Sequence, residues 1–306
     1  TLKNEIVACK LQYPDMAAAV DSDLPQLKLI LSIYEATDKA IQTKYILQEV
    51  DERLREELDY AREARQCRLY AHMLRDEKHI HVPRVIDALC GPRLLTTSWL
   101  EGRSILEFKK APLETRNRLA LQLFRAWYVP LYHYGIIHGD PHMGNYTIDK
   151  NMGLNLLDFG CIRVFSAPFI QGIIDLYHAL QNDDRDLAVK AYEAWGFKNL
   201  SRELIDTLTI WARFLYSAVL DDRTRTIGKS EGTVYGRETA LQVHAKLRAL
   251  GGVTVPREFV FMDRAALGLG SVFIHLQAEV NWHDLFNELI EGFDRAKMEK
   301  NQQEAL

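Results

Sequence analysis

Apolar residues in the first third of the chain recur first at strand spacing and then at helix spacing. The stretch EIVACKLQ at 5–12 mixes β-branched and apolar residues over the length of a strand, and YPDM then breaks it. The sequence DSDLPQLKLILSIYEA that follows predicts a helix with Ser22 or Asp23 as its cap. A second, longer helix is predicted for 38–76, because apolar residues recur there at helical steps among charged ones: Ile46, Val50, Leu54, Leu58 and Ala61.

The middle of the chain predicts short strands followed by a largely helical region. RVIDAL and RLLTTSWL are predicted as two strands separated by the turn CGP, and EGRS then opens a helical section. From about residue 105 the pattern is mostly helical, except between 136 and 165. There the extended runs NYTI and LNLLDF are joined by the turn DKNMG.

The last third predicts helices almost throughout. The first of them has Ser166 as its N-cap and Pro168 in its first turn. One long loop is predicted at 228–238, and the apolar run at 266–276 predicts a buried helix, since a bilayer span needs roughly 20 apolar residues. The order of elements predicts an α+β fold whose N-terminal third contains strands and whose remainder is helical.

Composition narrows the class of protein without identifying a chemistry. The 306 residues are 47% hydrophobic and 26% charged, which is typical of a soluble globular protein of one domain or two lobes. A net charge of -4 gives no reason to expect a nucleic acid as partner. The cysteines lack CxxC spacing, which argues against a zinc knuckle or a disulfide framework and favours a reducing, cytoplasmic setting. Because the sequence starts at Thr1, just ahead of a predicted strand, we expect it to be N-terminally truncated.

The stretch IIHGDPHMGN and the LLDFG that follows it carry the strongest chemical signal. Phosphoryl transfer from ATP is catalysed by positioning and by metal charge. A carboxylate such as Asp140 can orient the attacking hydroxyl and accept its proton, while Asn145 and Asp158 offer the oxygen ligands that Mg²⁺ prefers. The spacing of these residues matches the catalytic loop and DFG element of protein kinases. His138 and His142 flank Asp140, and we expect them to make structural hydrogen bonds rather than to bind metal.

A lysine that could anchor ATP lies far upstream. VACK at 7–10 resembles the kinase strand whose lysine grips the α- and β-phosphates and is held by a helix glutamate. Its partner is expected from the long helix, where REELDYAREAR offers four carboxylates: Glu56, Glu57, Asp59 and Glu63. The spacing from Lys10 is longer than in ordinary protein kinases, so position alone does not choose among them.

The surroundings of the loop favour a small acceptor over a protein. Gly139 takes the place of the arginine that pairs with a phosphorylated activation loop in many kinases, so we expect no such switch. Only CIRVF separates the DFG glycine, Gly160, from the next predicted helix start. This leaves little room for a peptide-docking loop and favours a small-molecule or lipid-like acceptor, or ATP hydrolysis.

Taken in order, five stretches resemble the UbiB (AarF-type) atypical kinases: VACKLQYPDM, EELDYAREA, VPRVIDALCGPRLLTTSWLEG, HGDPHMGN and LLDFG. The resemblance implies a protein-kinase-like, two-lobed fold, with an incomplete N-lobe at 1–101 and a helical C-lobe at 102–306. It implies that Lys10 anchors ATP with Glu63 as its ion-pair partner, and that Glu57 and Asp59 form the family's acidic pair beside the nucleotide. Asp140 would be catalytic, with Asn145 and Asp158 binding the metal.

The family resemblance also implies cofactors, a role and a location. The cofactors would be ATP and Mg²⁺, and the role would be a kinase or ATPase supporting ubiquinone biosynthesis or lipid homeostasis, in the cytoplasm or peripheral on the inner membrane. Near the lobe hinge, backbone groups of Thr97, Trp99 and Leu100 are expected to meet adenine. Two alternatives stay open: an aminoglycoside- or choline-type phosphotransferase, which shares HGDxxxxN, and a nucleotide-binding scaffold without turnover.

Overall fold

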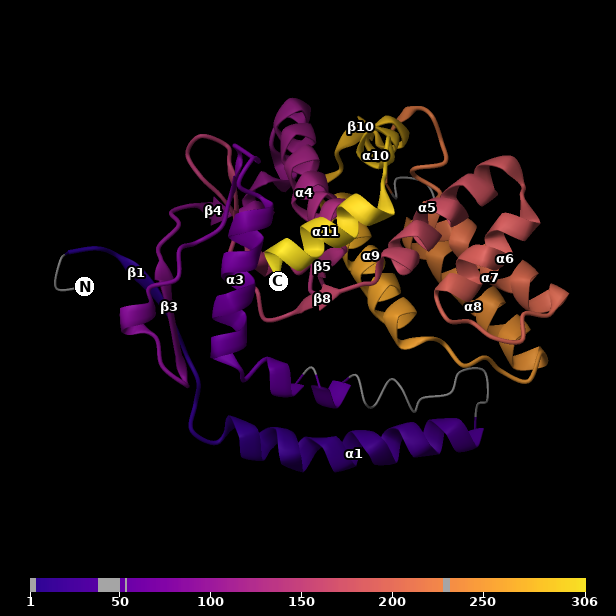
Figure 1. The fold of residues 1–306 in the computed structure, drawn as a ribbon, viewed down its shortest axis with the longest axis horizontal. Helices are drawn as coiled ribbons and strands as arrows, with labels where there is room; N and C mark the ends of the chain where they lie inside the picture. Colours follow the sequence, from indigo (N-terminus) through magenta and orange to yellow (C-terminus); the bar gives the residue numbers. More distant parts are fainter. Residues whose placement is uncertain (1–3, 38–49, 53, 228–231) are drawn as a thin grey trace.

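The N-terminal elements lie at one end of the molecule and along its lower edge (Figure 1). The computed structural model describes residues 4–37, 50–52, 54–227 and 232–306. Strand β1 (Val7–Leu11) pairs antiparallel with β3 (Leu94–Ser98), and the register places Lys10 opposite Leu95. Helix α1 (Met16–Thr37) runs along the lower edge in Figure 1, and α3 (Tyr60–Met73) stands between the strand pair and the helical bulk.

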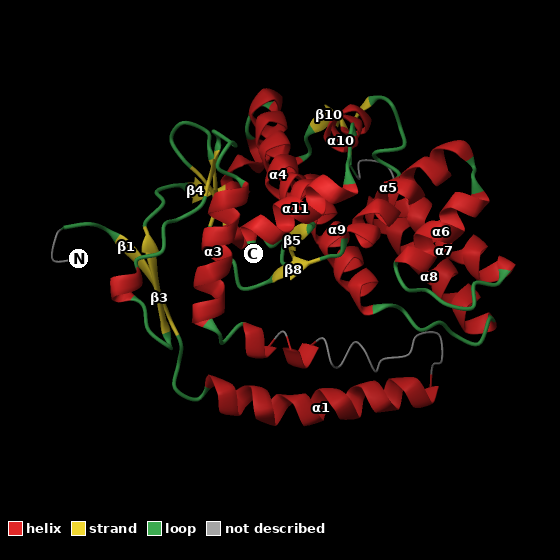
Figure 2. Ribbon diagram, in the orientation of Figure 1, coloured by secondary structure: helices red, strands yellow, loops and turns green. Residues whose placement is uncertain are grey.

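Helices make up most of the rest of the chain, as Figure 2 shows. They are α4 (Leu113–Tyr134), α5 (Ala167–Asn182), α6 (Arg185–Ala194), α7 (Arg202–Tyr216), α8 (Gly232–Ala249), α9 (Arg257–Leu276), α10 (Trp282–Ile290) and α11 (Arg295–Ala305). Helices α6, α7 and α8 gather at the end opposite β1 and β3 (Figure 1). The mixture of a strand-containing first third and a helical remainder confirms the predicted α+β class.

Two small sheets are formed by short strands between residues 80 and 164, on either side of helix α4 in the sequence. One has the order β2–β7–β6–β4 and the other pairs β5 with β8. The strands are β2 (Ile80–His81), β4 (Arg103–Ser104), β5 (Ile136–His138), β6 (Tyr146–Ile148), β7 (Leu154–Leu156) and β8 (Ile162–Val164). A further pair, β9 (Thr224–Thr226) and β10 (Glu279–Asn281), lies outside this region.

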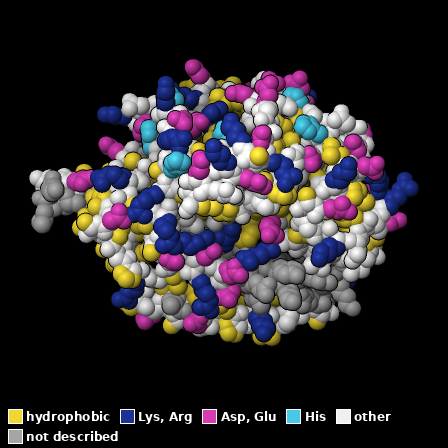
Figure 3. Space-filling model, viewed as in Figure 1, with side chains coloured by type: hydrophobic (Ala, Val, Ile, Leu, Met, Phe, Trp, Pro, Cys, Tyr) yellow, Lys and Arg dark blue, Asp and Glu magenta, His cyan; other side chains and the backbone are white. Residues whose placement is uncertain are grey.

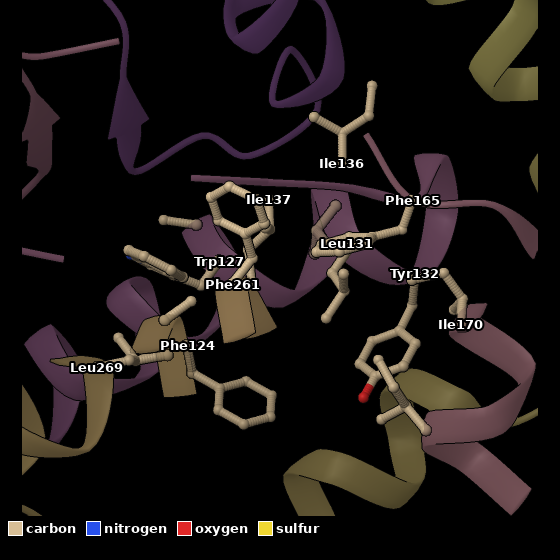
Figure 4. Packing of buried hydrophobic residues seen from close by; sticks show 14 of the residues in the cluster. Phe124, Trp127, Leu131, Tyr132, Ile136, Ile137, Phe165, Ile170, Phe261 and Leu269 are labelled. Carbon is tan, nitrogen blue, oxygen red and sulfur yellow. The ribbon is translucent and has the colours of Figure 1, made fainter. Parts of the chain in front are cut away.

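The main core surrounds α4, whose buried face meets α9, β5 and the start of α5. Figure 4 shows aromatic and aliphatic side chains of these elements packed against one another, among them Trp127, Tyr132 and Phe261. Trp127 also donates a hydrogen bond from Nε1 to the Tyr146 hydroxyl at 3.0 Å, so this core is tied to strand β6. The outer face in Figure 3 carries acidic and basic side chains interspersed, which keeps the local field mixed in sign there.

Two helix predictions in the N-terminal third are wrong in their limits. Helix α1 begins at Met16, so Ser22 and Asp23 lie inside it and cap nothing. The long helix predicted for 38–76 is interrupted by a turn before α3, because the Asp59 side chain accepts a hydrogen bond from the backbone N of Arg62 and starts a new helix. Ala61 is exposed, and the buried face of α3 is carried instead by residues such as Tyr60 and Cys67; Ile46 lies outside the described residues.

Two further predictions need correction, and a third is confirmed in part. RVIDAL is not a strand: only Val85 pairs, with Thr97, and residues 87–89 form a 3-10 turn. EGRS opens a helical section as predicted, since Ser104 caps the 3-10 helix Ile105–Lys110, but Arg103 and Ser104 also form the short strand β4. Within the loop predicted at 228–238, helix α8 already runs from Gly232, and residues 228–231 are outside the described part.

The apolar run at 266–276 is helical as predicted, but it belongs to the longer helix α9. One face of α9 is buried, through residues that include Ala265, Leu269 and Phe273. Among the described residues α9 is the one helix long and apolar enough to cross a bilayer, with 33% of its apolar window buried. A core helix of a soluble protein meets the same criteria of length and composition.

A buried carboxylate on α9 predicts a pH dependence of stability. Asp263 accepts a hydrogen bond from Trp211 Nε1 on α7 at 2.7 Å, and burial raises the pKa of Asp263 to about 6. The folded state therefore holds this proton more tightly than the unfolded state, so its contribution to stability is present below pH 4 and is lost as pH rises towards 6.

We expect Asp263→Asn, which keeps an acceptor for Trp211, to raise the free energy of unfolding by about 2–3 kcal/mol at pH 7.5 relative to the parent. The gain should be mostly gone near pH 4, because Asp263 is then protonated in the folded state and close to half protonated in the unfolded state. Denaturant melts of both proteins at pH 4, 5.5 and 7.5 measure the difference. An equal difference at all three values would contradict the assignment.

Candidate active site

The catalytic loop is positioned by the end of α4 and the short pair β5–β8. Gly135 ends α4 in a left-handed conformation with φ of 65°, and β5 then runs to His138. His138 Nε2 donates to the backbone O of Asp158 at 2.7 Å, and His138 Nδ1 accepts from the backbone N of Asp140 at 3.2 Å. His138, only 5% exposed, thus ties Asp140 to Asp158 through structural hydrogen bonds, as predicted.

The hairpin β6–β7 brings the predicted metal ligands to the same end. Tyr146 pairs with Leu156, and the backbone N of Leu157 donates to the backbone O of Asn145 at 3.1 Å. Asn145 Nδ2 also donates to the backbone O of Asp140 at 3.3 Å. His142, the other predicted structural histidine, accepts from the backbone N of Gly144 at 3.1 Å and so stabilises the turn between Asp140 and Asn145.

Lys10 sits between two carboxylates from distant parts of the chain. Its Nζ donates to Glu63 Oε2 at 2.8 Å and to Glu63 Oε1 at 3.0 Å, and it lies 3.4 Å from Asp158 Oδ2. The Glu63 side chain is 4% exposed, whereas those of Lys10 and Asp158 are 36% and 35% exposed. Of the four carboxylates that the sequence offered for Lys10, the structure brings Glu63 to it.

The charges in this triad alter one another's protonation. Burial raises the pKa of Glu63, the nearby Asp158 charge adds to this effect, and Lys10 opposes it. Burial also acts to raise the pKa of Asp158, but Lys10 and the backbone N–H of Gly160 outweigh it, so the net pKa is lowered. The pKa of Lys10 is raised because Asp158 and Glu63 together overcome its burial. Glu63 therefore holds a proton more tightly than an ordinary glutamate, and Asp158 less tightly than an ordinary aspartate.

The acidic segment before α3 lies beside the DFG glycine. The Glu57 carboxylate would be 3.9 Å from a Cβ built on Gly160, and Asp59 caps α3. Their neighbour Glu56 bridges two arginines, with Oε1 3.0 Å from Arg62 Nη2 and Oε2 2.6 Å from Arg163 Nη2. The segment is thus fastened to the strand that follows DFG, although its roles toward a nucleotide remain predictions.

The hinge residues are only partly available to a ligand. Thr97 lies inside the β1–β3 pair, opposite Ala8, and the backbone N of Trp99 donates to Ile6 O at 3.4 Å. Trp99 and Leu100 line a cavity of about 590 Å³ between the hinge and the β6–β7 turn. Thr97 and Trp99 thus use backbone groups in strand pairing, and the roles of Thr97, Trp99 and Leu100 toward adenine stay predictions.

The donor set fits a hard divalent cation. Asp158 Oδ1 accepts from the backbone N of Gly160 at 2.9 Å, which fixes the carboxylate, and the exposed fraction of this side chain leaves it open to a ligand. Asn145 uses its Nδ2 toward Asp140 O, so its carbonyl Oδ1 is turned to the other side of the amide. An amide oxygen and a carboxylate at neighbouring positions are the oxygen ligands that Mg²⁺ accepts together with phosphates.

Helix α9 contributes a residue near Asp140, the predicted catalytic aspartate, that the sequence did not single out. Arg264 Nη2 lies 3.8 Å from Asp140 Oδ1. No motif surrounds Arg264, and it is far from Asp140 along the chain, so only the packing of α9 could have revealed it. The sole sequence signal was the apolar periodicity of α9 itself.

Comparisons with known proteins agree with this geometry. Residues 1–192 match the family model described as the ABC1 atypical kinase-like domain. The chain is similar to atypical kinase COQ8B, mitochondrial, of Rattus norvegicus, with 29% identity over 181 residues covering 59% of this chain and 34% of the relative. It is also similar to the chloroplastic protein ACTIVITY OF BC1 COMPLEX KINASE 1 of Arabidopsis thaliana, with 30% identity over 191 residues covering 60% of this chain and 28% of the relative.

Longer alignments extend the likeness to the C-terminal helices. The Danio rerio atypical kinase COQ8B is 22% identical over 307 residues, which cover 97% of this chain and 47% of the relative. The solved structure of the Rv3197–erythromycin complex from Mycobacterium tuberculosis has a TM-score of 0.66 at 21% identity and covers 95% of this chain and 73% of that one. This likeness shows the fold, and the chain spans less than half the length of these curated relatives.

Proposed function

Because the chain belongs to the ABC1 atypical kinase-like family, we propose that it binds Mg-ATP and transfers or hydrolyses the terminal phosphoryl group. The observation that carries the proposal is the contact of Lys10 with both Glu63 and Asp158, since phosphoryl transfer by protein kinases needs this lysine–glutamate pair and the DFG aspartate together. We also propose that residues 1–101 and 102–306 act as the two lobes around the nucleotide, with the hinge near Trp99.

Each side chain would have one task. Lys10, held by Glu63, would bind the α- and β-phosphates, with Glu57 and Asp59 beside the nucleotide. Asn145 and Asp158 would hold Mg²⁺, which when bound neutralises phosphate charge. Asp140 would accept the proton of the attacking water or hydroxyl while the oxygen of that water or hydroxyl bonds to the γ-phosphorus. The bond from that phosphorus to the bridging oxygen breaks, and its electron pair leaves with ADP.

The acceptor that fits best is water, a small molecule or a lipid-like molecule. Strand β8 pairs with β5 directly after the DFG glycine, and α5 begins at Ala167, so this segment is short and held in place. A peptide-docking loop would need a longer segment here. The family resemblance implies a role in ubiquinone biosynthesis or lipid homeostasis, with peripheral contact to an inner membrane. The names of the relatives describe them as mitochondrial or chloroplastic proteins.

The test is a thermal-shift titration with ATP, with and without Mg²⁺, together with measurement of ADP release. Ligand binding to the native state alone raises the melting temperature. We expect a rise that depends on Mg²⁺ and slow ADP release that peptide mixtures do not accelerate. Binding without ADP release would favour the scaffold alternative, and efficient peptide phosphorylation would contradict the proposed class of acceptor.

A further inference from the structure

One face of helix α9 packs against strand β8 and the loop that contains Asp140. Phe261, Arg264 and Gly268 are spaced at helical steps of three and four residues, so they lie along the same side of the helix. The Phe261 ring centroid is 4.5 Å from the Arg163 guanidinium carbon on β8. Three residues later, Arg264 approaches Asp140. This face of α9 therefore contacts both the strand after DFG and the catalytic loop.

The backbone of α9 comes unusually close to that loop. A Cβ built on Gly268 would be 2.4 Å from Pro141 Cγ, and Pro141 directly follows Asp140. Real Cβ contacts are never that short, so any side chain at 268 would push α9 away from Pro141. Gly268 thus sets the distance between the helix that carries Arg264 and the residue next to Asp140.

Arg264 has donor groups to spare. Its side chain is 60% exposed, and that of Asp140 is 44% exposed. The 3.8 Å between Arg264 Nη2 and Asp140 Oδ1 is beyond hydrogen-bond length, so the contact occupies none of the guanidinium N–H groups fully. An arginine presents five N–H donors in a planar fork that suits phosphate oxygens.

The catalytic loop itself supplies no strong cation. The stretch IIHGDPHMGN contains neither lysine nor arginine, and His142 Nδ1 is used as the acceptor of the Gly144 N–H. Yet the transferred phosphoryl group carries negative charge on its equatorial oxygens, and in GTPases an arginine brought to it from outside the phosphate-binding loop stabilises that charge. Among the described residues, Arg264 is the arginine that forms an ion pair with Asp140.

We propose that Arg264 is a catalytic residue that contacts the phosphoryl group during its transfer and neutralises its charge. Gly268 is the positioning residue that lets α9 approach the loop containing Asp140. The inference rests on the proposed function, because it needs Mg-ATP at Lys10 and Asp158. It adds a group from beyond residues 1–192, the part that matches the family model.

Its test compares Arg264→Gln and Arg264→Lys with the parent and with Arg295→Gln, which changes an exposed arginine at the start of α11. We expect Arg264→Gln to lower kcat for ADP release by about 10²–10³-fold, the usual loss when one stabilising donor is removed. KM for ATP and the Mg-ATP thermal shift should change little. Arg264→Lys should recover part of the rate, because it keeps the charge but not the fork, and Arg295→Gln should match the parent.

A second readout separates charge neutralisation from packing. Added guanidinium ion, at concentrations the parent tolerates, should raise the rate of Arg264→Gln and leave that of Arg295→Gln unchanged. A rise in KM alone, parent-like kcat, or no rescue with a lowered melting temperature would each overturn the inference. If the parent itself neither binds Mg-ATP nor releases ADP, the proposed function fails first; if it does both and Arg264→Gln does so equally, only this inference fails.

Discussion

Asp158→Asn is expected to remove the Mg²⁺-dependent part of the ATP thermal shift and to lower ADP release by about 10³-fold, the upper range for loss of one electrostatic stabiliser. The carboxylate is fixed by the N–H of Gly160 and remains partly open to a ligand, as a metal anchor must be. Asparagine offers an oxygen of similar shape without the charge. Thermal-shift titrations with ATP, with and without Mg²⁺, measure the first effect, and an assay of ADP release measures the second.

The matched control for this prediction is Asp149→Asn. Asp149 lies at the turn of the same hairpin and likewise accepts backbone N–H groups, from Asn151 and Gly153, both at 2.7 Å. It is outside the Lys10 triad, so its variant should lose stability without losing the Mg²⁺-dependent shift. If both variants lose the shift, hairpin geometry rather than metal binding explains the Asp158 result. A parent-like shift in Asp158→Asn would contradict its role as metal ligand.

The proximity of the predicted catalytic and metal-binding residues could be predicted because their geometry is local. Asp140, Asn145 and Asp158 belong to one loop and the hairpin that follows, and antiparallel pairing of β6 with β7 returns the chain to Asn145 just before Asp158. Fixed spacing along such a hairpin translates directly into proximity in space. Lys10 and Glu63 are not local, and only the family resemblance assigned their pairing.

The errors arose where periodicity was followed across a helix boundary. Apolar residues recur on both sides of Asp59, but its side chain caps α3 and the chain turns there. The apparent stripe therefore ran across the break between two helical segments. A cap of the Asp type three residues before Arg62 was the available signal, and it outweighs a weak periodic pattern.

The contact of Arg264 with Asp140 is of another kind. It depends on the packing of α9 across the catalytic loop, which Gly268 allows by its missing side chain. Neither the arginine nor the glycine lies in a recognisable motif. Long-range packing of this sort is set by how whole helices fit together, and a single sequence does not contain it in any local window.

Glu63→Gln is expected to lower ADP release by about 10²-fold while costing less stability than the loss of a buried ion-pair partner usually does. The rate falls because Lys10 keeps at most one of its two hydrogen bonds, to a neutral amide oxygen, and is drawn toward Asp158; displacement of a positioning group by about 1 Å can cost 10²-fold. Stability changes less because Lys10 is partly exposed and keeps Asp158 as a partner. We expect a loss below the about 3–5 kcal/mol typical of a broken buried pair.

The pH dependence distinguishes this explanation from simple damage to the fold. Burial, followed by the Asp158 charge, raises the pKa of Glu63, so the folded state binds its proton more tightly than the unfolded state does. Its contribution to stability is therefore present at pH values below the ordinary glutamate pKa and is lost as pH rises through the raised value. Glu63→Gln cannot titrate in that pH range and should lose less stability than the parent as the pH rises through it.

Denaturant melts over this pH range measure the difference in the free energy of unfolding. The control is Glu107→Gln, which breaks an exposed pair with Arg103. Parallel pH profiles for Glu63→Gln and the parent, or an unchanged rate, would show that Lys10 does not depend on Glu63.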